Sequence, residues 1–154
     1  MCSHAQQLAR LLEAVTSGVG VGGIHGGAGD AFRQACGFQW MMGGQFVSHP
    51  GDSKAHYTVR IIDRDHPITE GIEDFELTSE QYYMHVDPHV KVLATTTFTG
   101  EHAPWIEGAT VPVAWKKMYG KSRVFYTSLG HVVSDFNVPE AKTIVQRGML
   151  WATR

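Results

Sequence analysis

Three histidines of this chain stand where an apolar run gives way to glycine or proline. His25 follows GVGVGGI, His49 lies in QFVSHPG, and His131 follows VFYTSLG. In an α/β domain the loops at strand ends form the crevice in which ligands bind. Because free imidazole has a pKa near 6.5, it can carry a proton or bind a metal at neutral pH. We therefore predict that these three histidines share one site.

Three interpretations of this set are open. His25, His49 and His131, with Glu80 as an oxygen donor, could bind zinc or a similar divalent ion and leave a position for substrate. Alternatively, His25, Glu80 and His131 could act as catalytic acid and base groups without a metal. In the third interpretation each histidine is a loop residue that bonds to nearby backbone. These four residues are far apart in the sequence and form no compact H-x-x-x-H motif that would decide for a metal.

Other polar and aromatic side chains are candidates for binding substrate. Tyr82 and Trp105 could stack on a sugar ring or hydrogen-bond to it, and we group His49 and His85 with them as substrate-binding residues. Asp135 lies four residues after His131. It could orient that imidazole, or it could simply be a solvated surface carboxylate.

Two better-known kinds of site are not supported. Gly18, Gly20 and Gly23 fit the G-x-G-x-x-G spacing of dinucleotide-binding loops, but they precede and lie within a predicted strand instead of opening a helix. A G-x-S-x-G nucleophile motif is absent, and Cys36 lies well past the first strand end. We expect neither a dinucleotide cofactor nor a serine or cysteine nucleophile.

Length, composition and charge exclude several classes of protein. The 154 residues suit one domain, and 13 Lys and Arg against 15 Asp and Glu form no basic patch for nucleic acid. Cys2 and Cys36 do not suggest a disulfide framework. The first 15 residues have charges among their apolar positions, unlike a signal peptide, and there is no apolar run of membrane-spanning length. We expect a cytoplasmic protein without membrane or nucleic-acid partners.

Periodicity predicts alternating helices and strands. A helix carries Leu8, Leu11, Leu12 and Val15 on one face, and a second helix opens with Asp30 near its N-cap. A short helix is expected from Thr78 or Ser79 through Tyr83, and a closing helix from Pro139. The patterns predict strands over 19–24, 55–63 and 91–98, and a β-hairpin over 111–117 and 123–129.

Six blocks of the chain, in order, resemble the ThuA-like family, named for trehalose utilisation, of the class I glutamine amidotransferase-like superfamily. They are GVGVGGIHGG, MMGGQFVSHPG, DRDHPITEGI, TSEQYYMHVDP, VPVAWKKMYGKSRVFYTSLGH and QRGMLWATR. The resemblance implies a three-layer, flavodoxin-like α/β fold with a mostly parallel sheet and a C-terminal β-hairpin. It also places His25 at the strand-to-helix elbow where glutaminases of the superfamily carry cysteine, so cysteine-dependent glutamine hydrolysis is not expected.

The chain also departs from the family pattern. Ser79 stands where the family usually has an acid, and Ser122 replaces a turn glycine. Family members normally carry about two further β/α units before the first helix, so residues 1–154 resemble a single ThuA-like domain truncated at its N-terminus. A parallel sheet without its first strands would expose an unpaired edge, and we expect a second copy to cover it.

The resemblance implies action on a carbohydrate, such as a disaccharide like trehalose or a 3-keto-glycoside. Histidine and glutamate would supply acid and base chemistry, with or without a divalent metal such as zinc. The alternative is a non-catalytic sugar-binding or assembly module that keeps the pocket.

Overall fold

The computed structural model describes residues 4–153. Its four α-helices are α1 (His4–Ser17), α2 (His25–Gly29), α3 (Cys36–Met42) and α4 (Pro139–Ala152). The strands are β1 (Val21–Ile24), β2 (Gly44–Ser48), β3 (His56–Ile61), β4 (Phe75–Thr78), β5 (Tyr83–Val86), β6 (Lys91–Thr97), β7 (Thr110–Tyr119) and β8 (Ser122–Thr127). Three short 3-10 helices lie in loops: η1 (Asp52–Lys54), η2 (Pro104–Ile106) and η3 (Val133–Asn137).

The main sheet has six strands in the order β1-β8-β7-β6-β3-β4, and β2 pairs with β5 in a separate two-stranded ribbon. Only the pair β1 and β8 is parallel; all the other described strand pairs are antiparallel. The prediction of a mostly parallel sheet is therefore wrong. Parallel neighbours need a crossover between them, whereas β7 and β8 are joined by a tight turn at Gly120 and Lys121. The pairs β3–β4 and β6–β7 are also consecutive in the chain and are joined by loops.

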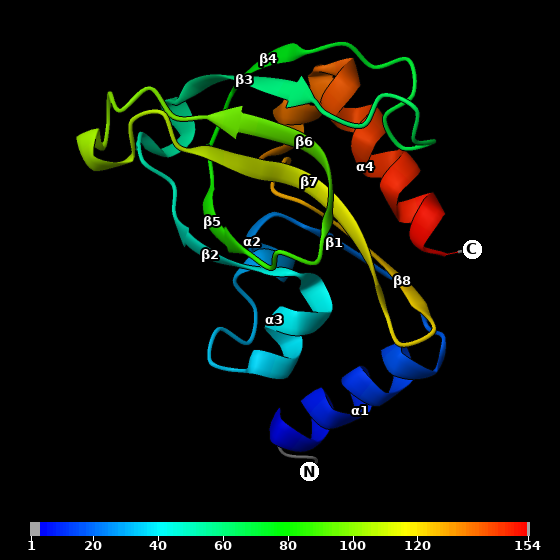
Figure 1. The fold of residues 1–154 in the computed structure, drawn as a ribbon. Coiled ribbons are helices and arrows are strands. Elements are labelled where there is room, and N and C mark those ends of the chain that lie inside the picture. The colour runs from blue at the N-terminus through cyan, green and yellow to red at the C-terminus, as the bar shows by residue number, and fades with distance from the viewer. Residues whose placement is uncertain (1–3, 154) are drawn as a thin grey trace.

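Helices cover both faces of the β1 and β8 end of the sheet. Figure 1 shows α4 on one side and α1 with α3 on the other. Gly148 of α4 lies against the ring of Phe125, so a Cβ at this position would overlap the ring and glycine allows the helix to approach the strand. On the opposite face, Trp115 and Tyr126 pack with Met41 and Met42 of α3. This layered α/β arrangement agrees with the predicted fold class, although the strand directions do not.

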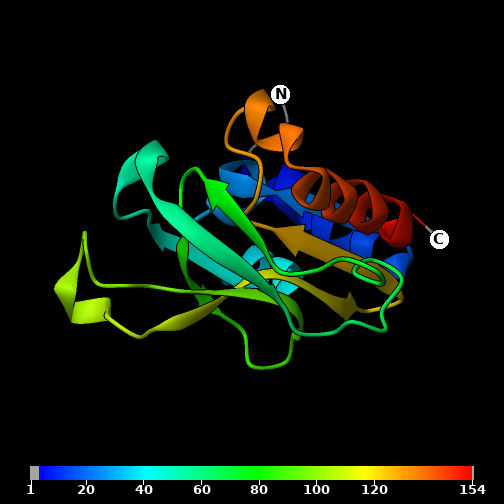
Figure 2. The same ribbon diagram turned by 90° about the horizontal axis from the view of Figure 1, so that it is seen from above.

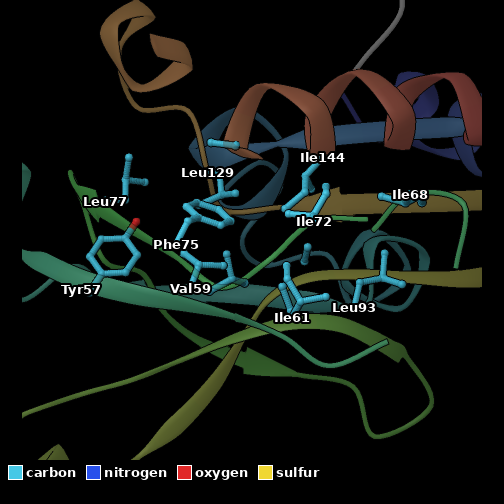
Figure 3. Packing of buried hydrophobic residues seen from close by; sticks show 14 of the residues in the cluster. Tyr57, Val59, Ile61, Ile68, Ile72, Phe75, Leu77, Leu93, Leu129 and Ile144 are labelled. Carbon is cyan, nitrogen blue, oxygen red and sulfur yellow. The ribbon is translucent and has the colours of Figure 1, made fainter. Parts of the chain in front are cut away.

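The core between α4 and the sheet extends along the antiparallel strands. Figure 3 shows its side chains from β3, β4, β6 and the 68–72 turn, meeting Leu129 and Ile144. The alternation in β3 puts Tyr57, Val59 and Ile61 into this core. This core therefore packs the antiparallel strands against α4.

Most predicted elements are present with shifted ends, including the first helix, the hairpin and the closing helix. The predicted short helix near Glu80 is wrong: residues 79–82 are a loop, and Tyr83 begins β5, which pairs with β2. The backbone N–H of Ser79 instead donates a hydrogen bond to the carbonyl of Ala55, the residue before β3. This hydrogen bond holds the loop beside the start of β3. Asp30 is also not an N-cap, because α2 begins at His25 directly after β1, and Asp30 is the C-cap that follows its last residue.

Strand β1 is an edge strand of the main sheet and pairs only with β8 among the described residues. A second copy covering this edge stays a prediction, which sedimentation at micromolar concentration would test. None of the helices in residues 4–153 has the length and apolarity required to cross a membrane.

Candidate functional site

His25 occupies a sharp bend between β1 and α2. Its φ of 46° lies in the left-handed region, which costs an L-residue roughly 1–3 kcal/mol and occurs most often at functional sites. The bend is held by Tyr126, whose hydroxyl donates to the carbonyl of His25 at 3.1 Å. Gly23 is needed below the bend, since an added Cβ would lie 2.6 Å from Cβ of Ala28.

The bend has a signal in the sequence. Gly23 and Gly27 flank His25 at the spacing of the G-x-S-x-G elbow, with histidine in the place of the nucleophile. The spacing of the two glycines, with any residue between them at the centre, is enough to indicate this strand-to-helix bend.

The structure brings His25, Glu80 and His131 together. Nε2 of His25 lies 3.2 Å from Oε2 of Glu80, and Nδ1 of His131 lies 3.3 Å from the same oxygen. The centroids of the two imidazole rings are 5.2 Å apart. One carboxylate oxygen therefore lies close to both imidazoles. Neither contact has the alignment of a good hydrogen bond. Nε2 of His25 is buried and has no hydrogen-bond partner.

The three side chains differ in access to solvent. The side chains of Glu80 and His25 are 12% and 15% exposed, whereas that of His131 is 33% exposed. Burial lowers the pKa of His25, and the nearby charge of Glu80 only partly opposes this effect. His25 is therefore held in its neutral form near pH 7, and His131 is the imidazole that a ligand reaches most easily.

Tyr82 closes the cluster on the side away from Glu80. Its hydroxyl and Nδ1 of His25 are hydrogen-bonded at 3.0 Å, and their ring centroids are 4.3 Å apart. Burial, with the negative charge of Glu80, raises the pKa of Tyr82, so it stays a neutral phenol. A phenol here fixes the His25 ring and can donate to or accept from Nδ1.

His49 lies beside this cluster. Its ring stacks on Tyr82 with centroids 6.1 Å apart, and Nδ1 is 3.2 Å from a carboxylate oxygen of Asp52. The group of possible metal ligands within 4.8 Å of one another contains His25, Glu80 and His131 but not His49. If a metal binds, the geometry therefore favours Glu80 over His49 as the third ligand.

The other two predicted substrate-binding residues line separate hollows. His85 on β5 borders a hollow of about 420 Å³ with Trp40 and Asp87. Trp105 on η2 borders another of about 410 Å³ with Tyr83 and Pro50. Their roles stay predictions.

Three further residues hold the loops of His131 and Glu80, and the sequence did not settle a role for any of them. Asp135 is buried, and its Oδ2 accepts hydrogen bonds from the backbone of His131 at 2.8 Å and from the hydroxyl of Ser79 at 2.7 Å. Tyr57 of the core also donates from its hydroxyl to the carbonyl of Glu80 at 3.2 Å. No local pattern links Asp135 with Ser79 or Tyr57 with Glu80, because these partners are far apart in the sequence.

Comparison with known proteins places the chain in a family. The family model ThuA, described as trehalose utilisation, matches residues 2–152. The chain belongs to the ThuA family. No curated protein matches it.

Solved structures share the fold of this ThuA chain. A ThuA-like protein from Parabacteroides merdae superposes with a TM-score of 0.76 at 21% identity, covering 96% of this chain and 65% of the other. One from Bacteroides uniformis gives a TM-score of 0.77 at 19% identity, covering 99% of this chain and 65% of the other. At these identities the likeness shows the fold alone, and this chain spans about 65% of the length of either protein.

The same fold also forms part of a larger enzyme. A β-galactosidase from Bacillus circulans superposes with a TM-score of 0.59 at 11% identity, covering 94% of this chain but 20% of the β-galactosidase.

Proposed function

We propose that this ThuA-family chain acts on a carbohydrate by acid and base catalysis, with His131, Glu80 and His25 as the catalytic residues. The observation that carries the proposal is the single carboxylate oxygen of Glu80 lying between two imidazoles, at a strained strand-to-helix bend. Family membership supports the substrate class, since the family is described by trehalose utilisation.

The exposures assign different tasks to the two histidines. His131 is the most exposed of the three, and Glu80 lies at its Nδ1, which leaves Nε2 free to take a proton from substrate or return it. The carboxylate would stabilise the imidazolium that forms, as the acid of a catalytic triad does. His25, hydrogen-bonded to Tyr82, holds the opposite side of the carboxylate and remains neutral because it is buried.

A divalent metal in the same place is the second form of this proposal. His25, Glu80 and His131 offer one ligand atom each within 4.8 Å, and the unpartnered Nε2 of His25 is a donor that zinc would accept. Three protein ligands and one open position are the usual arrangement of a catalytic zinc, which would activate a water or polarise a carbonyl.

The test is turnover of a panel of disaccharides and 3-keto-glycosides by purified protein. We expect His131→Ala and His25→Ala each to lower kcat by about 100-fold or more, the usual contribution of a positioned acid or base, while the circular dichroism spectrum stays that of the wild type. His56→Ala is the matched control, because His56 pairs with Glu76 at 3.3 Å on the exposed surface of β3 and β4.

Unchanged rates in both site variants would contradict the catalytic proposal. Wild-type protein that binds a sugar without converting it would favour the alternative of a sugar-binding module.

A further inference from the structure

The side chain of Tyr82 is buried against the ring of His25. Its ring contacts those of His25 and Phe46, with centroids 4.3 Å and 4.5 Å away, and its hydroxyl and Nδ1 of His25 are hydrogen-bonded at 3.0 Å. A phenol and a neutral imidazole can each supply the proton of such a bond. The other groups around the two side chains therefore decide which of them is the donor.

The hydroxyl of Tyr82 has a single acceptor for its proton. Within residues 4–153 Nδ1 of His25 is its only side-chain partner. The backbone N–H of Gly26, in the first turn of α2, donates to the hydroxyl oxygen, and a Cβ added to Gly26 would lie 3.1 Å from that oxygen. Because an N–H group cannot accept, the phenol proton goes to Nδ1 of His25; otherwise a buried O–H group would be left without an acceptor, which is unfavourable.

The other ring nitrogen of His25 leads to the same result. Nε2 lies 3.2 Å from Oε2 of Glu80. If Nδ1 carried the ring proton, the lone pair of Nε2 would face a carboxylate oxygen, and these two electron-rich atoms would repel each other. With the proton on Nε2, an N–H group faces the carboxylate, and this contact is attractive even without the alignment of a good hydrogen bond.

These two contacts together fix where His25 carries its proton. Since Nδ1 accepts from Tyr82, His25 is not an imidazolium, which has a proton on both nitrogens, and its one ring proton lies on Nε2. The same reasoning puts a proton on Nδ1 of His131, which is 3.3 Å from the same oxygen of Glu80. Of the four ring nitrogens in these two histidines, Nε2 of His131 alone is left as a free base.

The fold brings these groups together at one end of the sheet. Strands β1 and β8 are parallel, and Ile24 at the end of β1 pairs with Thr127 at the end of β8. The segments that follow therefore leave the sheet side by side, with His25 on α2 (blue in Figure 2) and His131 before η3 (orange). The loop over residues 79–82 supplies the other two groups, so three separate segments build this chain of contacts.

We propose that Tyr82 is a positioning residue that fixes His25 as a neutral imidazole with its proton on Nε2. The proposal rests on the proposed function and deepens it: His25 holds Glu80 toward His131, and Nε2 of His131 is the catalytic base. This role of Tyr82 differs from the substrate-binding role expected from the sequence. It favours the form of the proposed function without a metal, because zinc needs the lone pair of Nε2 of His25.

The experiment is NMR spectroscopy, near neutral pH, of protein labelled with nitrogen-15 in its histidine rings. Correlations between the carbon-bound ring protons and the ring nitrogens show which nitrogen is protonated, and His25→Ala identifies the signals of His25. We expect a protonated Nε2 and an unprotonated Nδ1 in the wild type. In Tyr82→Phe the Nδ1 signal should move, because this nitrogen loses its hydrogen-bond donor, and kcat should fall by about tenfold.

Tyr119→Phe is the matched control. Tyr119 ends β7, and its hydroxyl makes no hydrogen bond within the described part of the chain. This variant should keep the Nδ1 signal and the kcat of the wild type. A proton on Nδ1 of His25 in the wild type, or an Nδ1 signal that is the same in Tyr82→Phe, would overturn the proposal.

The spectra are recorded without substrate, which separates this inference from the proposed function. The expected proton positions in a protein that converts no sugar would contradict the catalytic function and support the assignment of Tyr82 as the donor to His25. Turnover that depends on His131, in a protein whose His25 is protonated on Nδ1, would do the reverse.

Discussion

The hydroxyl of Ser79 donates a 2.7 Å hydrogen bond to Oδ2 of Asp135, although the two residues are 56 positions apart. Each is close in sequence to a site residue, since Ser79 precedes Glu80 and Asp135 follows His131 by four residues. The same carboxylate oxygen accepts the backbone N–H groups of His131 and Val132. One buried carboxylate therefore ties together the two loops that bring Glu80 to His131.

We predict that Asp135→Ala destabilises the protein by about 2–3 kcal/mol, because three donors lose a charged acceptor. Ser79→Ala, which removes one donor, should cost about 1 kcal/mol. Urea unfolding monitored by circular dichroism measures both. Asp65→Asn, at an exposed aspartate, is the control and should stay within about 0.5 kcal/mol of wild type. Equal stabilities of Asp135→Ala and wild type would contradict the assigned role.

Zinc binding offers a second prediction. If the metal form of the proposed function holds, calorimetric titration should show one zinc ion per chain. His25→Ala, Glu80→Gln and His131→Ala should each weaken binding by more than about 100-fold, since loss of outer partners alone costs about 10- to 100-fold. His49→Ala should bind nearly as the wild type, because His49 lies outside the close group. If the wild type does not bind zinc, the metal form of the proposal is wrong, and the metal-free form of acid and base catalysis stands.

His66 gives the protein a predictable dependence of stability on pH. Burial lowers the pKa of His66, and the charge of Lys116 adds to this effect. Its Nδ1 also accepts a hydrogen bond from the backbone of Ile68 at 3.3 Å, which protonation would remove. The unfolded chain, with a pKa near 6.5, therefore binds the proton more readily than the folded protein.

It follows that His66 contributes stability at and above pH 7 that is lost as the pH falls below 6.5 toward the lower folded-state pKa. We expect the free energy of unfolding to decrease more between pH 7.5 and pH 5.5 in the wild type than in His66→Gln. Urea unfolding at both pH values measures the difference, and the other titrating groups cancel in the comparison. An equal decrease in both proteins would rule this contribution out.

Gly148 provides a test of the layer contact between α4 and the sheet. A Cβ at this position would overlap the ring of Phe125, which is fully buried. Gly148→Ala should therefore destabilise the protein by about 1–3 kcal/mol through overpacking. Gly27→Ala in α2 is the matched control: an added Cβ there meets nothing within 4 Å, and alanine is the better helix former by up to about 1 kcal/mol. A Gly148→Ala protein as stable as the wild type would mean that α4 can shift away from β8.

The sequence by itself was enough to place His25, His49 and His131 at the ends of apolar segments, to predict the hairpin and the first and last helices, and to identify the ThuA family from six ordered blocks. These are local properties: side-chain periodicity follows helix and strand geometry, and turns follow glycine and proline.

Only the tertiary structure decided which strands are parallel, that Glu80 lies in a loop and not on a helix, and that one oxygen of Glu80 lies between His25 and His131. It also separated His49 from the group of possible metal ligands and put Trp105 and His85 in different hollows. These relationships depend on strand pairing and register between segments far apart in the chain, which the local sequence pattern does not specify.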